Sequence, residues 1–169
     1  MKRIFLTVFF AISGIFLFAQ NKRDTTNIRP LNNFNLNILG EASIISINYE
    51  RLFLINSRFF LTGQLGIGYN EEFQLNLFGG PPPEKYRIIS HHITGNLGKR
   101  RHFLEFGLGG AIITGNTNKH YLLGPIVGYR LQPLKSNRIN LRIFGSIPVI
   151  GFETDIMYIP FGLSLGVCF

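Results

Sequence analysis

Hydrophobic and polar residues alternate along most of the chain after its first twenty residues. At the C-terminus, Phe161, Leu163, Leu165, Val167 and Phe169 are separated by small or polar residues. A period of two is typical of a β-strand with one apolar face, and no helical period competes with it after residue 19. The alternation predicts eight strands, over residues 34–38, 45–50, 59–70, 89–97, 104–112, 120–132, 137–150 and 160–169.

The connections between these segments alternate in length. Residues 56–57, 98–101 and 133–137 are short enough for hairpin turns, whereas the connection 71–85 contains a Gly-Gly-Pro-Pro-Pro run that no strand tolerates. An even number of antiparallel strands with short turns at one end and longer loops at the other is typical of outer-membrane barrels. We therefore predict an all-β fold, an eight-stranded antiparallel up-and-down transmembrane β-barrel.

The composition favours lipid rather than water around the barrel. Charged residues make up only 15% of the chain, whereas a water-facing surface carries roughly a quarter or more. The predicted polar face consists mainly of Gly, Ser, Asn and Thr, which suits a narrow interior. Tyr49, Tyr69, Tyr121 and Tyr129 fall on the apolar face, where their rings are expected at the two headgroup levels.

The few charges on the polar face are predicted to meet inside the barrel. The alternation points Glu50, Glu105, Arg130, Arg138 and Arg142 inward, and buried charges are tolerated when they are paired. An eight-stranded barrel is just filled by side chains, so no open pore is expected. We predict a carboxylate–guanidinium network in the interior, built from Glu50, Glu105, Arg130 and Arg142.

The first residues read as an export signal. Lys2 and Arg3 precede an uncharged, mostly apolar stretch from 4 to 18, and polarity begins abruptly after Ala19. This stretch is shorter than the roughly 20 residues of a membrane-spanning helix. We expect a cleaved signal peptide over 1–19, an N-terminal periplasmic segment over 20–32 and the barrel over 33–169.

Composition and charge exclude several classes of protein. The apolar content of 46% and 17 phenylalanines exclude a disordered chain, and the lone Cys168 excludes a disulfide scaffold or a cysteine-based zinc site. Lys and Arg exceed Asp and Glu by 17 to 9. The positive residues are scattered and the chain is predicted to be exported, so nucleic acid is not an expected partner.

Three stretches of the sequence carry a resemblance to a known family. They are 46–51 (SINYER), 98–107 (GKRRHFLEFG) and Gly128-Tyr129-Arg130 with Gln132-Pro133. Together they resemble a small outer-membrane β-barrel family of Bacteroidota, which is largely uncharacterised, and the likeness extends over about residues 33–169. A terminal Phe169 on an alternating strand resembles the recognition signal of the barrel-assembly machinery. The resemblance implies location in the cell outer membrane and says nothing of activity.

Catalytic motifs are sparse. Serine-hydrolase and phosphate-loop motifs are absent from the sequence. Ser90, His92, Thr94 and Glu105 could supply a hydroxyl, an imidazole and a carboxylate, a set that faintly resembles lipid A deacylase barrels, but the alternation points His92, Thr94 and Glu105 inward. His91 and His92 are a weak metal pair, since adjacent strand residues face opposite sides.

We therefore expect a structural or surface-interaction role, with no enzymatic activity and no cofactor. Outer-membrane lipid and the barrel-assembly machinery are the expected partners, and the loop 71–85 is the expected contact surface for an extracellular partner. Two alternatives remain open from the sequence: a lipid-modifying enzyme of the lipid A esterase type, and a soluble periplasmic, lipocalin-like binder of apolar ligands.

Overall fold

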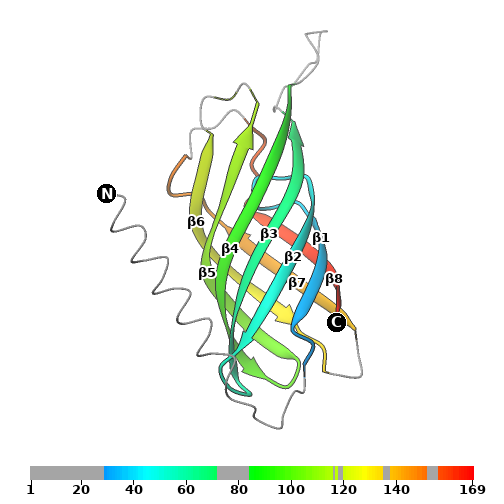
Figure 1. The fold of residues 1–169 in the computed structure, drawn as a ribbon. Helices are drawn as coiled ribbons and strands as arrows, with labels where there is room; N and C mark the ends of the chain where they lie inside the picture. The colour runs from blue at the N-terminus through cyan, green and yellow to red at the C-terminus, as the bar shows by residue number, and fades with distance from the viewer. Residues whose placement is uncertain (1–28, 72–83, 116, 118–119, 135–137, 152–155) are drawn as a thin grey trace, which may run out of the picture.

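The computed structural model describes residues 29–71, 84–115, 117, 120–134, 138–151 and 156–169. Within them the chain forms one closed barrel in which consecutive strands pair antiparallel and the first pairs with the last (Figure 1). The predicted all-β, eight-stranded antiparallel up-and-down barrel is confirmed. The strands are β1 (Asn32–Ile38), β2 (Ile45–Leu54), β3 (Phe59–Glu71), β4 (Lys85–Lys99), β5 (His102–Thr114), β6 (Tyr121–Leu131), β7 (Ile139–Ser146) and β8 (Phe161–Cys168).

Some sequence predictions fall on other parts of the chain. The signal peptide over 1–19, most of the segment 20–32 and nearly all of the loop 71–85 lie outside the described residues. Among the described residues, no helix is long and apolar enough to cross a membrane.

The two ends of the barrel differ in their connections. At one end of the barrel, called here the short-turn end, β2 leads to β3, β4 to β5 and β6 to β7, and β1 begins there. At the other end, called here the long-loop end, β1 leads to β2, β3 to β4, β5 to β6 and β7 to β8. In Figure 1 the short-turn end is at the bottom. The predicted alternation of connection lengths holds except between β6 and β7, where the seven-residue connection is longer than the six-residue connections β1–β2 and β5–β6.

Two strands extend four residues beyond one predicted bound, because the polarity of the two faces inverts near these strand ends. β4 begins at Lys85 rather than at 89, and β2 continues to Leu54 rather than ending at 50. At these ends Tyr86, Ile88 and Leu52 point into the barrel and are buried, while Arg87 points outward. The expected rule of apolar outside and polar inside therefore holds only for the middle of each strand.

The prediction that one strand runs over 137–150 is wrong at both ends. The β6–β7 ladder ends at the pair Ile126–Ser146. Pro148 has no N–H to continue it, and the amides of Val149 and Ile150 both donate to the Leu123 carbonyl, at 2.8 and 3.0 Å. Ile150 thus pairs with Leu123 one residue out of step with the ladder below. The extra residue makes this region a β-bulge.

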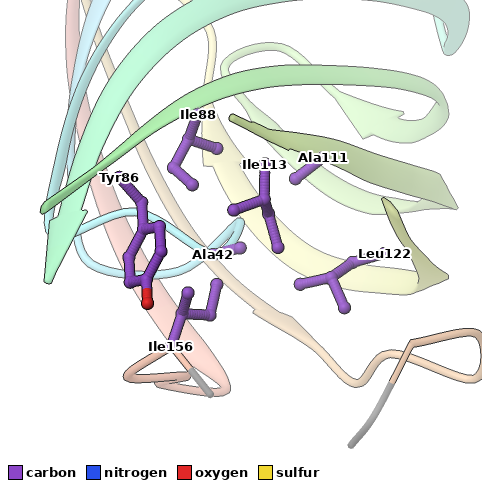
Figure 2. Packing of buried hydrophobic residues seen from close by; sticks show 7 residues of the cluster. All are labelled: Ala42, Tyr86, Ile88, Ala111, Ile113, Leu122 and Ile156. Atoms are coloured by element: carbon purple, nitrogen blue, oxygen red, sulfur yellow. The ribbon is translucent and has the colours of Figure 1, made fainter. Parts of the chain in front are cut away.

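The interior is layered along the barrel axis. Near the short-turn end, Leu52, Phe60 and Phe103 form a small apolar cluster, with the Phe60 and Phe103 rings 4.8 Å apart and edge to face. Polar and charged side chains fill the middle. Near the long-loop end, a second apolar cluster points inward from several strands and from two connections (Figure 2). Its members are Ala42, Tyr86, Ile88, Ala111, Ile113, Leu122 and Ile156.

Arg29 closes the short-turn end from below. Its guanidinium lies 4.6 Å from the centre of the Phe103 ring and donates to the carbonyls of Arg100 and Gln132. Burial lowers the pKa of Arg29 from its ordinary value. The residues just before β1 therefore pack against the barrel and seal its lower apolar cluster.

Candidate functional site

The middle of the interior holds the charged residues that the alternation selected. Glu50 comes from β2, Glu105 from β5, Arg130 from β6 and Arg142 from β7. Each lies at an inward position of its strand and is at most 2% exposed. The structure brings all four together, although Arg142 lies 92 positions after Glu50 in the sequence.

Glu105 is the centre of this network. Arg130 grips the Glu50 carboxylate with both terminal nitrogens, one of them 2.8 Å from Glu50 Oε2. The same nitrogen, Nη2, lies 3.3 Å from Glu105 Oε1, and Arg142 Nε donates to Glu105 Oε2 at 2.7 Å. Glu105 therefore bridges two guanidiniums from the next two strands, while the bidentate grip fixes Arg130 against β2.

Neutral side chains complete the hydrogen bonding of the carboxylates. Asn33 Nδ2 donates to Glu50 Oε1 at 2.8 Å, and Thr94 Oγ1 donates to Glu105 Oε1 at 2.8 Å. The Arg142 guanidinium also lies over the Phe144 ring, 4.0 Å from its centre. These contacts offset part of the cost of burying the charges.

A further carboxylate, which the sequence alternation does not mark, joins the network from the connection between β1 and β2. Glu41 lies in the β1–β2 connection, which folds into the barrel and is 7% exposed at this residue. Its Oε1 lies 2.9 Å from His92 Nδ1 and 3.3 Å from Arg142 Nη1, and Asn37 Nδ2 donates to its Oε2 at 3.1 Å. No periodic signal marks a residue in a turn, so the alternation could not find it.

The turn that carries Glu41 has an unusual backbone. Leu39, Gly40, Glu41 and Ala42 all have positive φ, at 62°, 72°, 51° and 60°. A non-glycine residue in this left-handed region costs roughly 1–2 kcal/mol, so contacts must hold the turn. Asn70 Nδ2 donates to the Ala42 carbonyl at 2.6 Å, and the ion pairs of Glu41 add to it.

The electrostatics of Glu41 follow from these contacts. Burial alone would raise its pKa, but the adjacent His92 imidazole and Arg142 guanidinium more than offset this and lower the pKa to about 2. Among the described residues, the interior thus holds three carboxylates, from Glu41, Glu50 and Glu105, against two guanidiniums and the imidazole of His92.

The residues of the possible hydrolytic site lie close together but not as a triad. Thr94 bonds to Glu105, whereas His92 faces Glu41 and Ser90 Oγ donates to Asn48 Oδ1 at 2.8 Å. Within the described residues no hydrogen bond joins the imidazole to either hydroxyl. All four side chains are buried inside the barrel, at most 3% exposed.

His91 and His92 point to opposite sides of the wall, as expected for neighbours in a strand. His91 stacks on Tyr121 on the outer face, with its Nε2 3.1 Å from the Tyr121 hydroxyl. The part of the chain that the structure describes holds no group of three His, Cys, Asp or Glu residues able to bind a metal.

The inward assignment of Arg138 is wrong. It precedes the first residue of β7 and is exposed at the short-turn end. The sequence alternation continues to Arg138, but the strand that forms the barrel wall begins only at Ile139.

No protein-family model, curated protein or solved structure matches this chain. The chemistry of the site must therefore be read from its own geometry. The network ties β2, β5, β6 and β7 across the interior, and its four charged side chains are buried and paired with one another.

Proposed function

We propose that this protein is an integral β-barrel of a bacterial outer membrane, with a structural or surface-interaction role and no open pore. One observation carries the proposal: the outer face of the barrel is apolar on every strand, while the charges of the strand middles lie inside. Large apolar side chains are exposed on the outside of all eight strands, among them Ile67, Ile93 and Val127 at 69%, 68% and 66%.

Such a surface is unfavourable in water. Exposed apolar patches on soluble monomers rarely exceed a few hundred Å², whereas here the apolar residues form a continuous belt around the barrel. In the closed barrel every strand pairs with two neighbours and no sheet edge is left open, which is what a hydrocarbon environment requires of a β structure.

Aromatic side chains border this belt. Towards the short-turn end, the Tyr49 hydroxyl donates to Asn32 Oδ1 at 2.8 Å and Tyr129 pairs with His102. Towards the long-loop end lie Tyr69 and Tyr121, near the ends of β3 and β6. The eight residue-to-residue steps from Tyr121 to Tyr129 cover about 20 Å of height in a strand tilted by roughly 40°. That span suits the apolar band of a transmembrane barrel, about 25 Å tall.

The proposal that the barrel has no open pore rests on the side chains that fill its interior. The apolar cluster with Phe60 and Phe103 blocks the short-turn end, the ionic network blocks the middle, and the turn with Glu41 enters from the long-loop end. Eight-stranded barrels have just enough room for such side chains.

The distribution of polarity also bears on the alternatives. A soluble lipocalin-like binder needs an apolar interior cavity and a polar exterior, the reverse of the faces observed in the middle of these strands. A lipid-modifying enzyme needs its hydroxyl and imidazole facing the bilayer, whereas Thr94 and His92 face the interior.

The partners follow from the same placement. Lipid of the outer membrane would surround the belt, and the barrel-assembly machinery would insert the chain through β8 and Phe169. Phe169 exchanges backbone hydrogen bonds with Asn32, at 2.9 and 3.1 Å, and stacks on Phe34, so this last residue completes the closing strand pair. An extracellular partner would bind through the loop 71–85.

The test is gel mobility of the protein in a washed outer-membrane fraction, with unheated and boiled samples side by side. A folded barrel resists detergent, so we expect a shift in mobility only after boiling. Release of the protein by carbonate washing, with no shift, would contradict the proposal and favour a soluble barrel.

A further inference from the structure

Positively charged side chains collect at the short-turn end of the barrel. Arg58 lies in the β2–β3 turn, Lys99 and Arg100 in the β4–β5 hairpin, and Arg138 before β7, and all four are exposed. Half-buried cations lie beside them on β2 and in the same hairpin. The basic rim consists of Arg51, Arg58, Lys99, Arg100, Arg101 and Arg138.

No described acidic residue lies at this end. Glu41, Glu50 and Glu105 are buried within the barrel, and Glu71 and Glu84 lie at the long-loop end. No ion pair between described residues involves a member of the rim. All described charged side chains of the rim are therefore positive, and they come from three of the connections and the strands beside them.

The other end carries a mixed surface. Lys85 and Arg87 are exposed at the start of β4, but Glu84 precedes them and Glu71 pairs with Lys85 across the β3–β4 ladder. The described side chains at the two ends of the barrel thus differ in their balance of positive and negative charge: one end is basic and the other is mixed.

The rim also lies directly beyond the apolar belt. Leu97 is an exposed apolar residue of β4, and Lys99 follows two positions later on the same outer face. On β2, Arg51 follows Tyr49 in the same way and donates to the Asn32 side chain at 2.6 Å. Long cationic side chains beside an apolar surface reach towards the polar boundary with their charged ends.

From this placement we propose that the basic rim binds the phosphate groups of anionic phospholipids in the leaflet at the short-turn end. The proposal rests on the proposed membrane location. Guanidinium groups suit phosphate oxygens because they donate in parallel pairs, and each Lys or Arg near an anionic surface adds to the attraction. The mixed surface at the other end has no such preference.

The experiment measures lipid selectivity directly. The full-length mature protein is reconstituted in phosphatidylcholine vesicles that contain spin-labelled phosphatidylglycerol or spin-labelled phosphatidylcholine. The fraction of each label immobilised at the protein surface gives their relative association constant. For the wild type we expect a preference for phosphatidylglycerol that declines with added salt.

Two double variants remove the same charge from opposite ends. Arg58→Gln with Lys99→Gln alters the rim and should lower the preference by at least about twofold. Lys85→Gln with Arg87→Gln alters the long-loop end and should leave the preference unchanged. Heat-modifiable mobility verifies that each variant is folded, and Arg138→Gln serves as a second rim variant should the first pair fail to fold.

The possible results separate the two proposals. Absence of any immobilised lipid would contradict the membrane location, and with it the rim. Immobilised lipid without preference for phosphatidylglycerol would overturn the rim proposal alone. A preference that survives the rim variants, or that both double variants reduce equally, would also overturn it, since the charge would then act without regard to its position.

Discussion

Among single residues, Glu105 has the largest share in the interior network. Its two oxygens face Arg130 and Arg142, at 3.3 and 2.7 Å, and it also accepts from Thr94. A buried charge is costly unless it is paired, and the two arginines are 1% and 2% exposed. Each arginine keeps one other carboxylate, Glu50 or Glu41, so loss of Glu105 would leave both only partly compensated.

Glu105→Ala should therefore destabilise the barrel by about 3–5 kcal/mol, the cost of breaking a buried pair from one side. The measurement is the free energy of unfolding in urea, followed by heat-modifiable mobility in detergent micelles or vesicles. Glu84→Ala, which removes an exposed carboxylate just before β4 that accepts from the Tyr86 hydroxyl at 3.1 Å, is the control and should cost about 1 kcal/mol, the net value of one hydrogen bond. Equal losses for the two variants would contradict a structural role of the network.

The lowered pKa of Glu41 predicts that the free energy of unfolding depends on pH. Its pKa is about 2 in the folded protein against an ordinary value of 4.5, so the unfolded chain binds its proton more tightly. The stabilisation is complete above the ordinary pKa and is lost as the pH falls towards 2. Glu41→Gln should thus reduce the free energy of unfolding at pH 6, and the difference from wild type should shrink by on the order of 3 kcal/mol between pH 6 and pH 2.

The matched control for this titration is Asn48→Ala, which removes a buried polar side chain that carries no ionisable group. Its difference from wild type should stay constant over the same range. A constant difference for Glu41→Gln as well would mean that the ion pairs of Glu41 do not contribute.

At the scale of elements, two segments approach each other closely where β6 meets the bulge that follows β7. A Cβ atom on Gly124 would lie 2.0 Å from the Ile147 carbonyl oxygen and 2.8 Å from Pro148 Cα. Both contacts are to backbone, so no side-chain rotation could relieve them. The bulge therefore requires a residue without a side chain on the facing strand.

Gly124→Ala should push the two backbones apart and destabilise the barrel by about 1–3 kcal/mol, the usual cost of an overpacked substitution. Gly63→Ala on the outer face of β3 is the control, because its nearest contact would be Phe53 Cε2 at 3.9 Å. That variant should be neutral or stabilised by up to about 1 kcal/mol through reduced freedom of the unfolded chain. Unfolding in urea compares the two.

The sequence predicts the strands correctly where the outer face is uniformly apolar and the inner face uniformly polar or small. In the middle of β5, β7 and β8 the outer residues are apolar and the inner residues polar or small, so a period of two located the strands and pointed Glu105 and Arg142 inward. Near the ends the surroundings change. Tyr86 and Leu52 turn inward, and the periodic rule missed those parts of β4 and β2.

Two other features could not be predicted from the sequence, because they depend on contacts between residues that are distant in the sequence. Glu41 meets His92 and Arg142 only after the β1–β2 turn adopts a left-handed backbone inside the closed barrel. The bulge after β7 depends on the Leu123 carbonyl of β6, which accepts from the amides of Val149 and Ile150. Neither has a local pattern, since the sequence around each reads as an ordinary turn or strand end.

At the scale of the whole molecule, the cost of placing a charge on the outer face distinguishes a barrel surrounded by lipid from one surrounded by water. A lysine on the outer face would cost almost nothing in a soluble protein, because surface substitutions change stability by about 0.5 kcal/mol or less. In a transmembrane barrel it costs about 2–4 kcal/mol at the midplane and about 0–1 kcal/mol near the interfaces. The depth dependence is therefore a direct test of the proposed location.

β4 offers two matched positions for this test. Ile93 and Leu97 are both on its outer face, 68% and 53% exposed, and Leu97 lies closer to the short-turn end. In vesicles, Ile93→Lys should lower the free energy of unfolding by about 2–4 kcal/mol and Leu97→Lys by about 0–1 kcal/mol. Because both substitutions make a similar chemical change to the same strand, only a membrane boundary between them explains unequal costs. Small and equal costs would instead place water around the belt and contradict the transmembrane proposal.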